Sequence, residues 1–131
     1  MVKVLIVDDS SAVRAYHAAV LQGCGFAVDV AANGYEGLEK ICAADYDVLL
    51  VDVNMPSMHG YELVKEIRKT ERGQSMGIIM ISTEAGPHDR LAAYKAGADL
   101  YLVKPVDPEE LKKTCLHLAG LKGGTYHEGT S

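Results

Sequence analysis

The stretch VKVLIVDDS, residues 2–10, raises the question that decides how this chain folds. An apolar run, Val4–Val7, ends directly on two acidic residues, Asp8 and Asp9. Charged side chains are rarely buried unless they are paired or bind a metal. The two acids therefore belong either to a solvated turn or to a site. Because Asp is common in turns and at helix starts, this stretch alone favours the turn.

Four more short apolar runs follow, and helical spacing separates each from the next. They are AVDVAA (27–32), DVLLVD (47–52), GIIMIS (77–82) and DLYLV (99–103). Three of the five runs are almost continuously apolar, which is typical of parallel strands covered on both faces. The alternation predicts an α/β fold in which a five-stranded parallel sheet is flanked by five helices.

The predicted helices differ in how well their apolar faces are defined. His17 falls on the apolar stripe of the first helix, so we interpret it as a core or half-buried residue and not as a ligand. The helix over 87–96 has the weakest stripe, with Leu91 and Ala92 as its main anchors. The last helix follows Asp107, a predicted N-cap.

Composition limits the class of protein. A length of 131 residues suits one domain, and 48% hydrophobic with 24% charged residues is ordinary for a soluble globular chain. The net charge of −5 argues against nucleic acid as a direct partner. No apolar run reaches the length of a membrane span and no leader precedes the first strand, so we expect a protein without membrane contact.

Two further expectations concern cysteines and chain organisation. Cys24, Cys42 and Cys115 are scattered without metal-ligand spacing, and we interpret them as buried reduced thiols. Reduced thiols are typical of the cytoplasm, so we expect a cytoplasmic protein. Residues 1–120 are predicted to form one domain. Residues 121–131, LKGGTYHEGTS, have no periodicity and are predicted to be a flexible tail.

The ends of the predicted strands gather reactive side chains. In an open parallel sheet, ligands bind at the carboxyl ends of the strands. The residues that fall there, in chain order, are Asp8, Asp9, Asp52, Ser82, Thr83 and Lys104. The rim thus collects three carboxylates, one or two hydroxyls and one ammonium. Loops of random composition would distribute acidic and basic residues over both rims of the sheet. The opening acids are therefore predicted to belong to a site.

The charges on this rim indicate its chemistry. Three neighbouring carboxylates repel one another unless a cation compensates them, and Mg²⁺ prefers such oxygen ligands. Lys104 and Ser82 suit contacts with phosphoryl oxygens, through an ammonium and a hydroxyl respectively. Asp52, kept ionised by metal and lysine, is the expected nucleophile of a phosphoryl transfer that gives an aspartyl phosphate.

The motifs VDDS, VDVNMP, IST and VKP stand at four strand ends in that order. Each is weak alone, but together they are specific, and over residues 2–120 the chain resembles the receiver domain of two-component response regulators, in particular the single-domain, chemotaxis-regulator-like type. The resemblance implies a flavodoxin-like, doubly wound sheet of order 2-1-3-4-5. It also implies a cis Lys104–Pro105 bond.

The resemblance further implies roles for individual residues. Asp52 would accept a phosphoryl group from a histidine kinase or a histidine phosphotransfer protein. Mg²⁺ would be bound by Asp9 and Asp52, by the backbone carbonyl of Asn54, and more distantly through Asp8. Tyr101 occupies the family's switch-aromatic position. A downstream protein target would bind the face built from the fourth helix, fifth strand and fifth helix.

Three alternatives remain open at this point. A Mg²⁺-dependent phosphatase would also use an aspartyl phosphate, but that family places its nucleophile after the first strand. A scaffold that has lost the switch conflicts with the intact set of acids, hydroxyl and lysine. The chain could also be a piece of a longer regulator. One departure from the family pattern is Thr83, where a small residue is usual. Beyond catalysing its own phosphorylation and dephosphorylation, the protein is expected to have no enzymatic activity.

Overall fold

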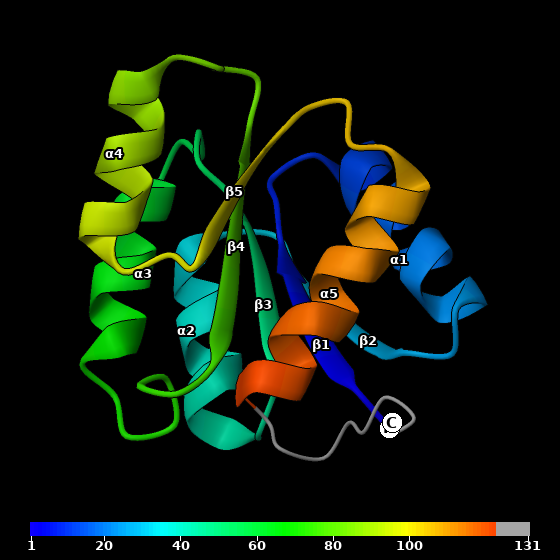
Figure 1. Cartoon of the computed structure of the whole chain (residues 1–131). Helices are drawn as coiled ribbons and strands as arrows, with labels where there is room; N and C mark the ends of the chain where they lie inside the picture. Colours follow the sequence, from blue (N-terminus) through cyan, green and yellow to red (C-terminus); the bar gives the residue numbers. More distant parts are fainter. Residues whose placement is uncertain (123–131) are drawn as a thin grey trace.

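Strands and helices alternate along the chain in the computed structural model, which describes residues 1–122 (Figure 1). The strands are β1 (Lys3–Val7), β2 (Ala27–Ala31), β3 (Val48–Asp52), β4 (Gly77–Ser82) and β5 (Leu100–Val103). The helices are α1 (Ser11–Gly23), α2 (Gly34–Ala43), α3 (Gly60–Arg68), α4 (Pro87–Ala96) and α5 (Pro108–Lys122). The predicted α/β fold is confirmed.

All neighbouring strands of the sheet run parallel, in the order β2-β1-β3-β4-β5. This is the order that the family resemblance implied. Val7 lies opposite Val51, so the residues that follow β1 lie beside the end of β3. Ser82 lies opposite Val103, which brings the end of β4 beside the residue that follows β5. The register therefore gathers the carboxyl ends of β1, β3, β4 and β5 on one rim.

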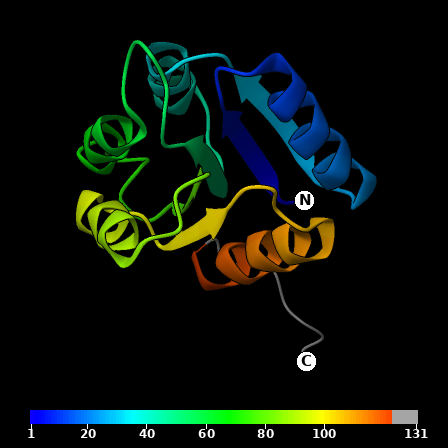
Figure 2. The same ribbon diagram turned by 90° about the horizontal axis from the view of Figure 1, so that it is seen from above.

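The sheet lies between two layers of helices (Figures 1 and 2). Helices α1 and α5 cover one face, and α2, α3 and α4 cover the other. Side chains alternate between the two faces along each strand, because successive Cβ atoms of a strand point in opposite directions. Leu5 thus belongs to the core beneath α2–α4, whereas Ile6 belongs to the core beneath α1 and α5. Every residue of β3 and β4 is buried, which explains their continuous apolar runs.

Four helices have side-chain N-caps and α4 has none. Ser10, Asn33 and Asp107 accept hydrogen bonds from backbone N–H groups in the first turns of α1, α2 and α5. At the start of α3, Nδ1 of His59 accepts from the N–H of Tyr61 at 3.3 Å. The predicted cap at Asp107 is confirmed. α4 starts after Gly86, without a capping hydrogen bond from a side chain. It is therefore held less firmly at its N-terminus than the four helices that a side chain caps.

The structure corrects the predicted anchors of α4. Leu91 is 53% exposed, so its prediction as a core residue was wrong. The helix instead packs through Ala93 and Ala96, which are buried. Small side chains let a helix lie close to its neighbours but remove little apolar surface from water. This agrees with the expectation that α4 is weakly anchored.

The cysteines and the domain end also differ from expectation. Cys115 is buried, but Cys24 and Cys42 are exposed, so two of the three thiols were predicted wrongly. α5 continues to Lys122, two residues beyond the expected domain end at residue 120. The rest of the predicted tail, 123–131, lies outside the described residues. Within residues 1–122, every helix is too short or too polar to cross a membrane.

Candidate functional site

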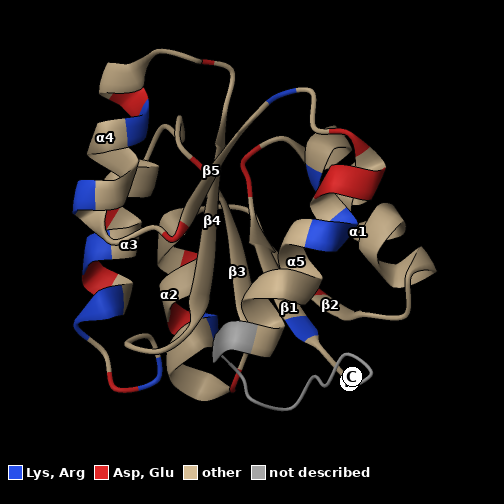
Figure 3. Ribbon diagram, viewed as in Figure 1, with Lys and Arg blue, Asp and Glu red and all other residues tan. Residues whose placement is uncertain are grey.

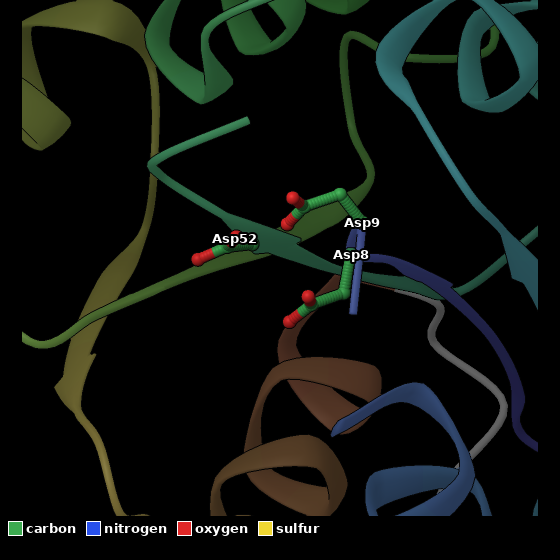
Figure 4. A group of neighbouring side chains, drawn as sticks. All are labelled: Asp8, Asp9 and Asp52. Carbon is green, nitrogen blue, oxygen red and sulfur yellow. The ribbon is translucent and has the colours of Figure 1, made fainter. Parts of the chain in front are cut away.

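Three carboxylates meet at the carboxyl ends of β1 and β3 (Figure 4). Asp8 and Asp9 follow β1, and Asp52 is the last residue of β3. Each offers an oxygen within 4.8 Å of the oxygens of the other two. Asp8 and Asp52 are buried, at 3% and 6% exposure, whereas Asp9 is exposed. The predicted convergence of the acids is therefore present, with one side of the cluster open to water.

Lys104 closes the buried side of the acidic cluster. Its Nζ lies 3.1 Å from Oδ1 of Asp52 and 3.4 Å from Oδ2 of Asp8. The backbone N–H of Lys104 donates to the carbonyl of Ser82 at 2.8 Å, which ties the residue after β5 to the end of β4. The Lys104–Pro105 peptide bond is cis, as predicted. One ammonium thus faces the two buried carboxylates.

Burial and charge raise the pKa of Asp52 from its usual 3.8 to about 6. Desolvation is the largest cause, and the charge of Asp8 and a hydrogen bond with Asp9 act in the same direction. Lys104 lowers the pKa through its hydrogen bond and its charge, but it does not offset burial. The site therefore holds more negative charge than its single lysine compensates.

The pKa of Lys104 responds in the opposite way. Burial lowers it, but the hydrogen bonds and charges of Asp52 and Asp8 outweigh burial, and the net effect raises the pKa above the usual 10.5. Lys104 is thus held in its charged form at neutral pH. A fixed positive charge beside a carboxylate suits the binding of an anionic group such as a phosphoryl.

Backbone contacts orient the Asp8–Asp9 segment. Oδ1 of Asp8 accepts from the N–H of Ser10 at 2.9 Å, and Nη1 of Arg14 donates to the carbonyl of Asp8 at 2.7 Å. Arg14 therefore holds the peptide that joins the two acids, a role that no motif in the sequence indicated. The sequence could have pointed to Arg14 only through its position near the start of the helix that follows the acidic pair.

The loop after β3 passes very close to Asp52. A Cβ atom at Gly60 would lie 2.5 Å from the carbonyl oxygen of Asp52 and 2.8 Å from Cα of Val53, so only glycine fits there. The N–H of Gly60 donates to the carbonyl of Val53 at 2.8 Å. Asn54, two residues after Asp52, is exposed in this loop. Gly60 therefore lets the start of α3 close tightly against the end of β3.

Ser82 and Tyr101 lie on the α4 side of the rim. Ser82 is 1% exposed, and its Oγ accepts from the N–H of Glu84 at 3.0 Å. Tyr101 is 4% exposed, and its hydroxyl donates to the carbonyl of Glu84 at 2.7 Å. Both residues therefore bind the β4–α4 loop, through the amide and the carbonyl of the same residue.

A cavity of about 420 Å³ adjoins Lys104 on the α1 side. Its lining includes His17, Tyr16 and Thr83, and Thr83 is exposed. His17 is buried, as predicted, and burial lowers its pKa more than the charge of Asp8 raises it. His17 therefore lines this cavity as an uncharged side chain at physiological pH.

A family model described as the response regulator receiver domain matches residues 4–116. The chain belongs to the response regulator receiver domain family. Members of this family are the phosphoacceptors of two-component signalling. The chain is 44% identical over 113 residues to chemotaxis protein CheY1 of Helicobacter pylori, covering 85% of this chain and 91% of that protein. It is 39% identical to the CheY homologue of Campylobacter jejuni, covering 93% and 95%.

Solved receiver structures have the same fold. Chemotaxis protein CheY4 of Vibrio cholerae superimposes with a TM-score of 0.87 at 42% identity, covering 90% of this chain and 98% of that one. The receiver domain of the sensor histidine kinase PA1611 of Pseudomonas aeruginosa gives a TM-score of 0.84 at 30% identity, covering 90% and 97%. That second structure contains a magnesium ion coordinated in its active site cleft.

The acidic cluster of this receiver fits a hard divalent cation. Its three carboxylates offer oxygens within 4.8 Å of one another, and one of them is open to solvent. Mg²⁺ takes oxygen ligands, keeps several waters and is commonly held by one or two carboxylates. Burial, and to a lesser degree the charge of Asp8, raise the pKa of Asp52, and Lys104 pairs with only two of the three carboxylates. A cation at this position would supply further positive charge.

Proposed function

We propose that Asp52 is the phosphoacceptor of this receiver. The observation that carries the proposal is the position of its carboxylate, which lies within 4.8 Å of oxygens of both Asp8 and Asp9 and 3.1 Å from Nζ of Lys104. Within the described residues this is where a nucleophilic oxygen, a cluster of metal ligands and a cation meet. The phosphoryl donor is the phosphohistidine of a histidine kinase or of a histidine phosphotransfer protein.

In the transfer step, a carboxylate oxygen of Asp52 attacks the phosphorus of the phosphohistidine. A P–O bond forms to Asp52 while the P–N bond breaks, and its electron pair stays on the imidazole nitrogen of the donor. Asp52 must be ionised to attack. The ammonium of Lys104 and, after rotation from Glu84, the hydroxyl of Ser82 donate to the phosphoryl oxygens.

The residues that would hold Mg²⁺ are Asp9 and Asp52, with the backbone carbonyl of Asn54 and a more distant contribution from Asp8. When bound, Mg²⁺ neutralises the charge shared by the carboxylates and the transferring phosphoryl group. Asp9 suits direct coordination because its side chain lies on the solvent-exposed side of the cluster. Arg14 and Ser10 keep the Asp8–Asp9 segment in place for it.

The output of the receiver is a change in protein binding. A phosphoryl group on Asp52 adds about −1.5 to −2 charge and three acceptor oxygens. These draw the hydroxyl of Ser82 away from Glu84, whose carbonyl also binds the hydroxyl of Tyr101. The face formed by α4, β5 and α5 would bind the downstream target, since α4 is the helix most easily displaced. We assign this switch to the cytoplasm, without nucleic acid as a direct partner.

Mass spectrometry after incubation with acetyl phosphate and Mg²⁺ tests the proposal. We expect one phosphoryl group on the unmodified chain and none on Asp52→Asn. Asp45→Asn is the matched control, because Asp45 is an exposed acid paired with Arg72 away from the rim. Equal labelling of Asp52→Asn would refute the assignment. Repeated turnover of a small phosphate ester would instead favour a phosphatase.

A further inference from the structure

Arg90 of α4 contacts Tyr101 of β5 in two ways. Its guanidinium carbon lies 5.3 Å from the centre of the Tyr101 ring, within the range of a cation–π interaction. Its Nη1 also lies 3.4 Å from the carbonyl oxygen of Tyr101, at the long end of hydrogen bonding. One arginine thus contacts both the ring and the backbone of the same residue.

The far end of the Tyr101 ring is held as well. Its hydroxyl donates to the carbonyl of Glu84 at 2.7 Å in the loop before α4. The turn of α4 that carries Arg90 is tied to α3, because the hydroxyl of Tyr61 donates to the carbonyl of Asp89 at 3.2 Å. Tyr101 is therefore held at its hydroxyl by the loop and across its ring by the helix.

We propose that Arg90 is a positioning residue that holds Tyr101 in its buried orientation and couples that orientation to the position of α4. This inference deepens the proposed function, since it rests on Tyr101 taking part in the output switch. Neither contact of Arg90 involves Asp52, Ser82 or Lys104, so its bias depends on the position of α4 and not on direct contact with the phosphoryl site. A displacement of α4 would move the guanidinium of Arg90 away from the ring of Tyr101, and the ring would then be free to change its orientation.

The packing of α4 makes this coupling effective. Within the described helix, only Ala93 and Ala96 are buried, and no side chain caps its N-terminus. Few apolar contacts therefore compete with the pair of contacts that Arg90 makes to β5. A cation–π interaction of ordinary strength corresponds to a change of about two- to fivefold in the ratio of buried to exposed ring orientations.

Side-chain NMR of the full chain tests the proposal. Rotamer populations of Tyr101 about χ1 would be measured in the unsubstituted protein and in Arg90→Ala, each with and without beryllofluoride and Mg²⁺. Arg90→Lys keeps the charge but not the planar group, and Arg72→Ala is the matched control, because Arg72 pairs with Asp45 at the surface. Amide shifts of residues 52 and 82 report beryllofluoride binding in the same samples.

We expect Arg90→Ala to lower the ratio of buried to exposed Tyr101 about two- to fivefold, Arg90→Lys to lower it less, and Arg72→Ala to leave it unchanged. An unchanged ratio in Arg90→Ala would overturn the proposal, as would an equal effect of Arg72→Ala. Failure of beryllofluoride to shift residues 52 and 82 would count against the phosphoacceptor site. It would leave the Arg90 result interpretable, because the rotamer ratio is measured without the ligand too.

Discussion

The two ends of the sheet both hold charged side chains at low exposure, but they balance them differently. At the carboxyl end, one lysine pairs with two of three neighbouring carboxylates, and the pKa of Asp52 rises to about 6. At the amino end of β4 and β5, Arg68 meets Asp99 at 3.0 Å. Arg68 also donates to the carbonyls of Gly97, Gly73 and Met76, and Asp99 accepts from the N–H of Ile78.

The difference separates a balanced charge cluster from an unbalanced one. Arg68 and Asp99 have complementary charge and several hydrogen bonds, which joins the end of α3 to the starts of β4 and β5. The carboxylates at the other end outnumber the lysine that pairs with them, an arrangement that would favour a bound cation. Elsewhere, along α3 and α4, acidic and basic positions are interspersed on the surface (Figure 3). Charged side chains alone therefore do not single out the candidate site. What distinguishes it is a cluster in which acidic side chains outnumber the basic one.

The largest effect is expected at the balanced end. Arg68→Ala removes several hydrogen bonds and leaves Asp99 without its guanidinium, so we expect a loss of about 3 kcal/mol in the free energy of unfolding. Urea denaturation measures it. Arg72→Ala is the control, since its exposed pair with Asp45 should cost less than about 1 kcal/mol. Similar losses for the two variants would contradict the contrast between the clusters.

At the unbalanced end, removing a charge should stabilise the protein. Because folding raises the pKa of Asp52 from 3.8 to about 6, its carboxyl favours the folded state below pH 4 and loses that contribution as pH rises through 6. Without Mg²⁺ at pH 7.5, Asp52→Asn should therefore be more stable by about 1–2 kcal/mol, less than the full shift because Lys104 loses a partner. The gain should disappear near pH 4. A destabilised variant at pH 7.5 would show that Asp52 is compensated.

The affinity for Mg²⁺ should distinguish the two acids that follow β1. Asp9→Ala should weaken Mg²⁺ binding roughly tenfold, or about 1.4 kcal/mol, and more than Asp8→Ala does. The reason is that Asp9 faces solvent, where a hydrated ion enters, whereas Asp8 already pairs with Lys104. Calorimetric titration measures both variants. Equal affinities in Asp9→Ala and the unsubstituted chain would contradict the direct-ligand role.

The smallest effect concerns the titration of Asp52. The carboxyl group of Asp52 should titrate near pH 6 in metal-free protein, as followed by the chemical shift of its carbon. Saturating Mg²⁺ should lower that midpoint by roughly half a pH unit or more, since a nearby cation favours the ionised form. Carbon-detected NMR follows it. Phosphoryl uptake should accordingly fall as pH drops through the midpoint. A midpoint near 4 without metal would remove the contrast with the Arg68 cluster.

The sequence predicted the parts of this site that follow from strand ends. Parallel strands place the residues after β1, β3, β4 and β5 on one rim whatever the details of packing, so the convergence of Asp8, Asp52 and Lys104 could be read from the chain. The family resemblance added the strand order and the cis Lys104–Pro105 bond. Helix surfaces were less predictable: Leu91 is exposed because α4 turns its alanines inward.

The sequence by itself determined the alternation of strands and helices and the chemistry of the rim, because hydrophobic periodicity and strand ends are local properties. Only the tertiary structure decided how strongly each charge is compensated. Arg14, Arg68 and Arg90 bind backbone carbonyls of residues 8, 73, 76, 97 and 101, and no side-chain pattern encodes a carbonyl as a partner. The pKa of Asp52 likewise depends on burial between strands, and burial exists only once the sheet has formed.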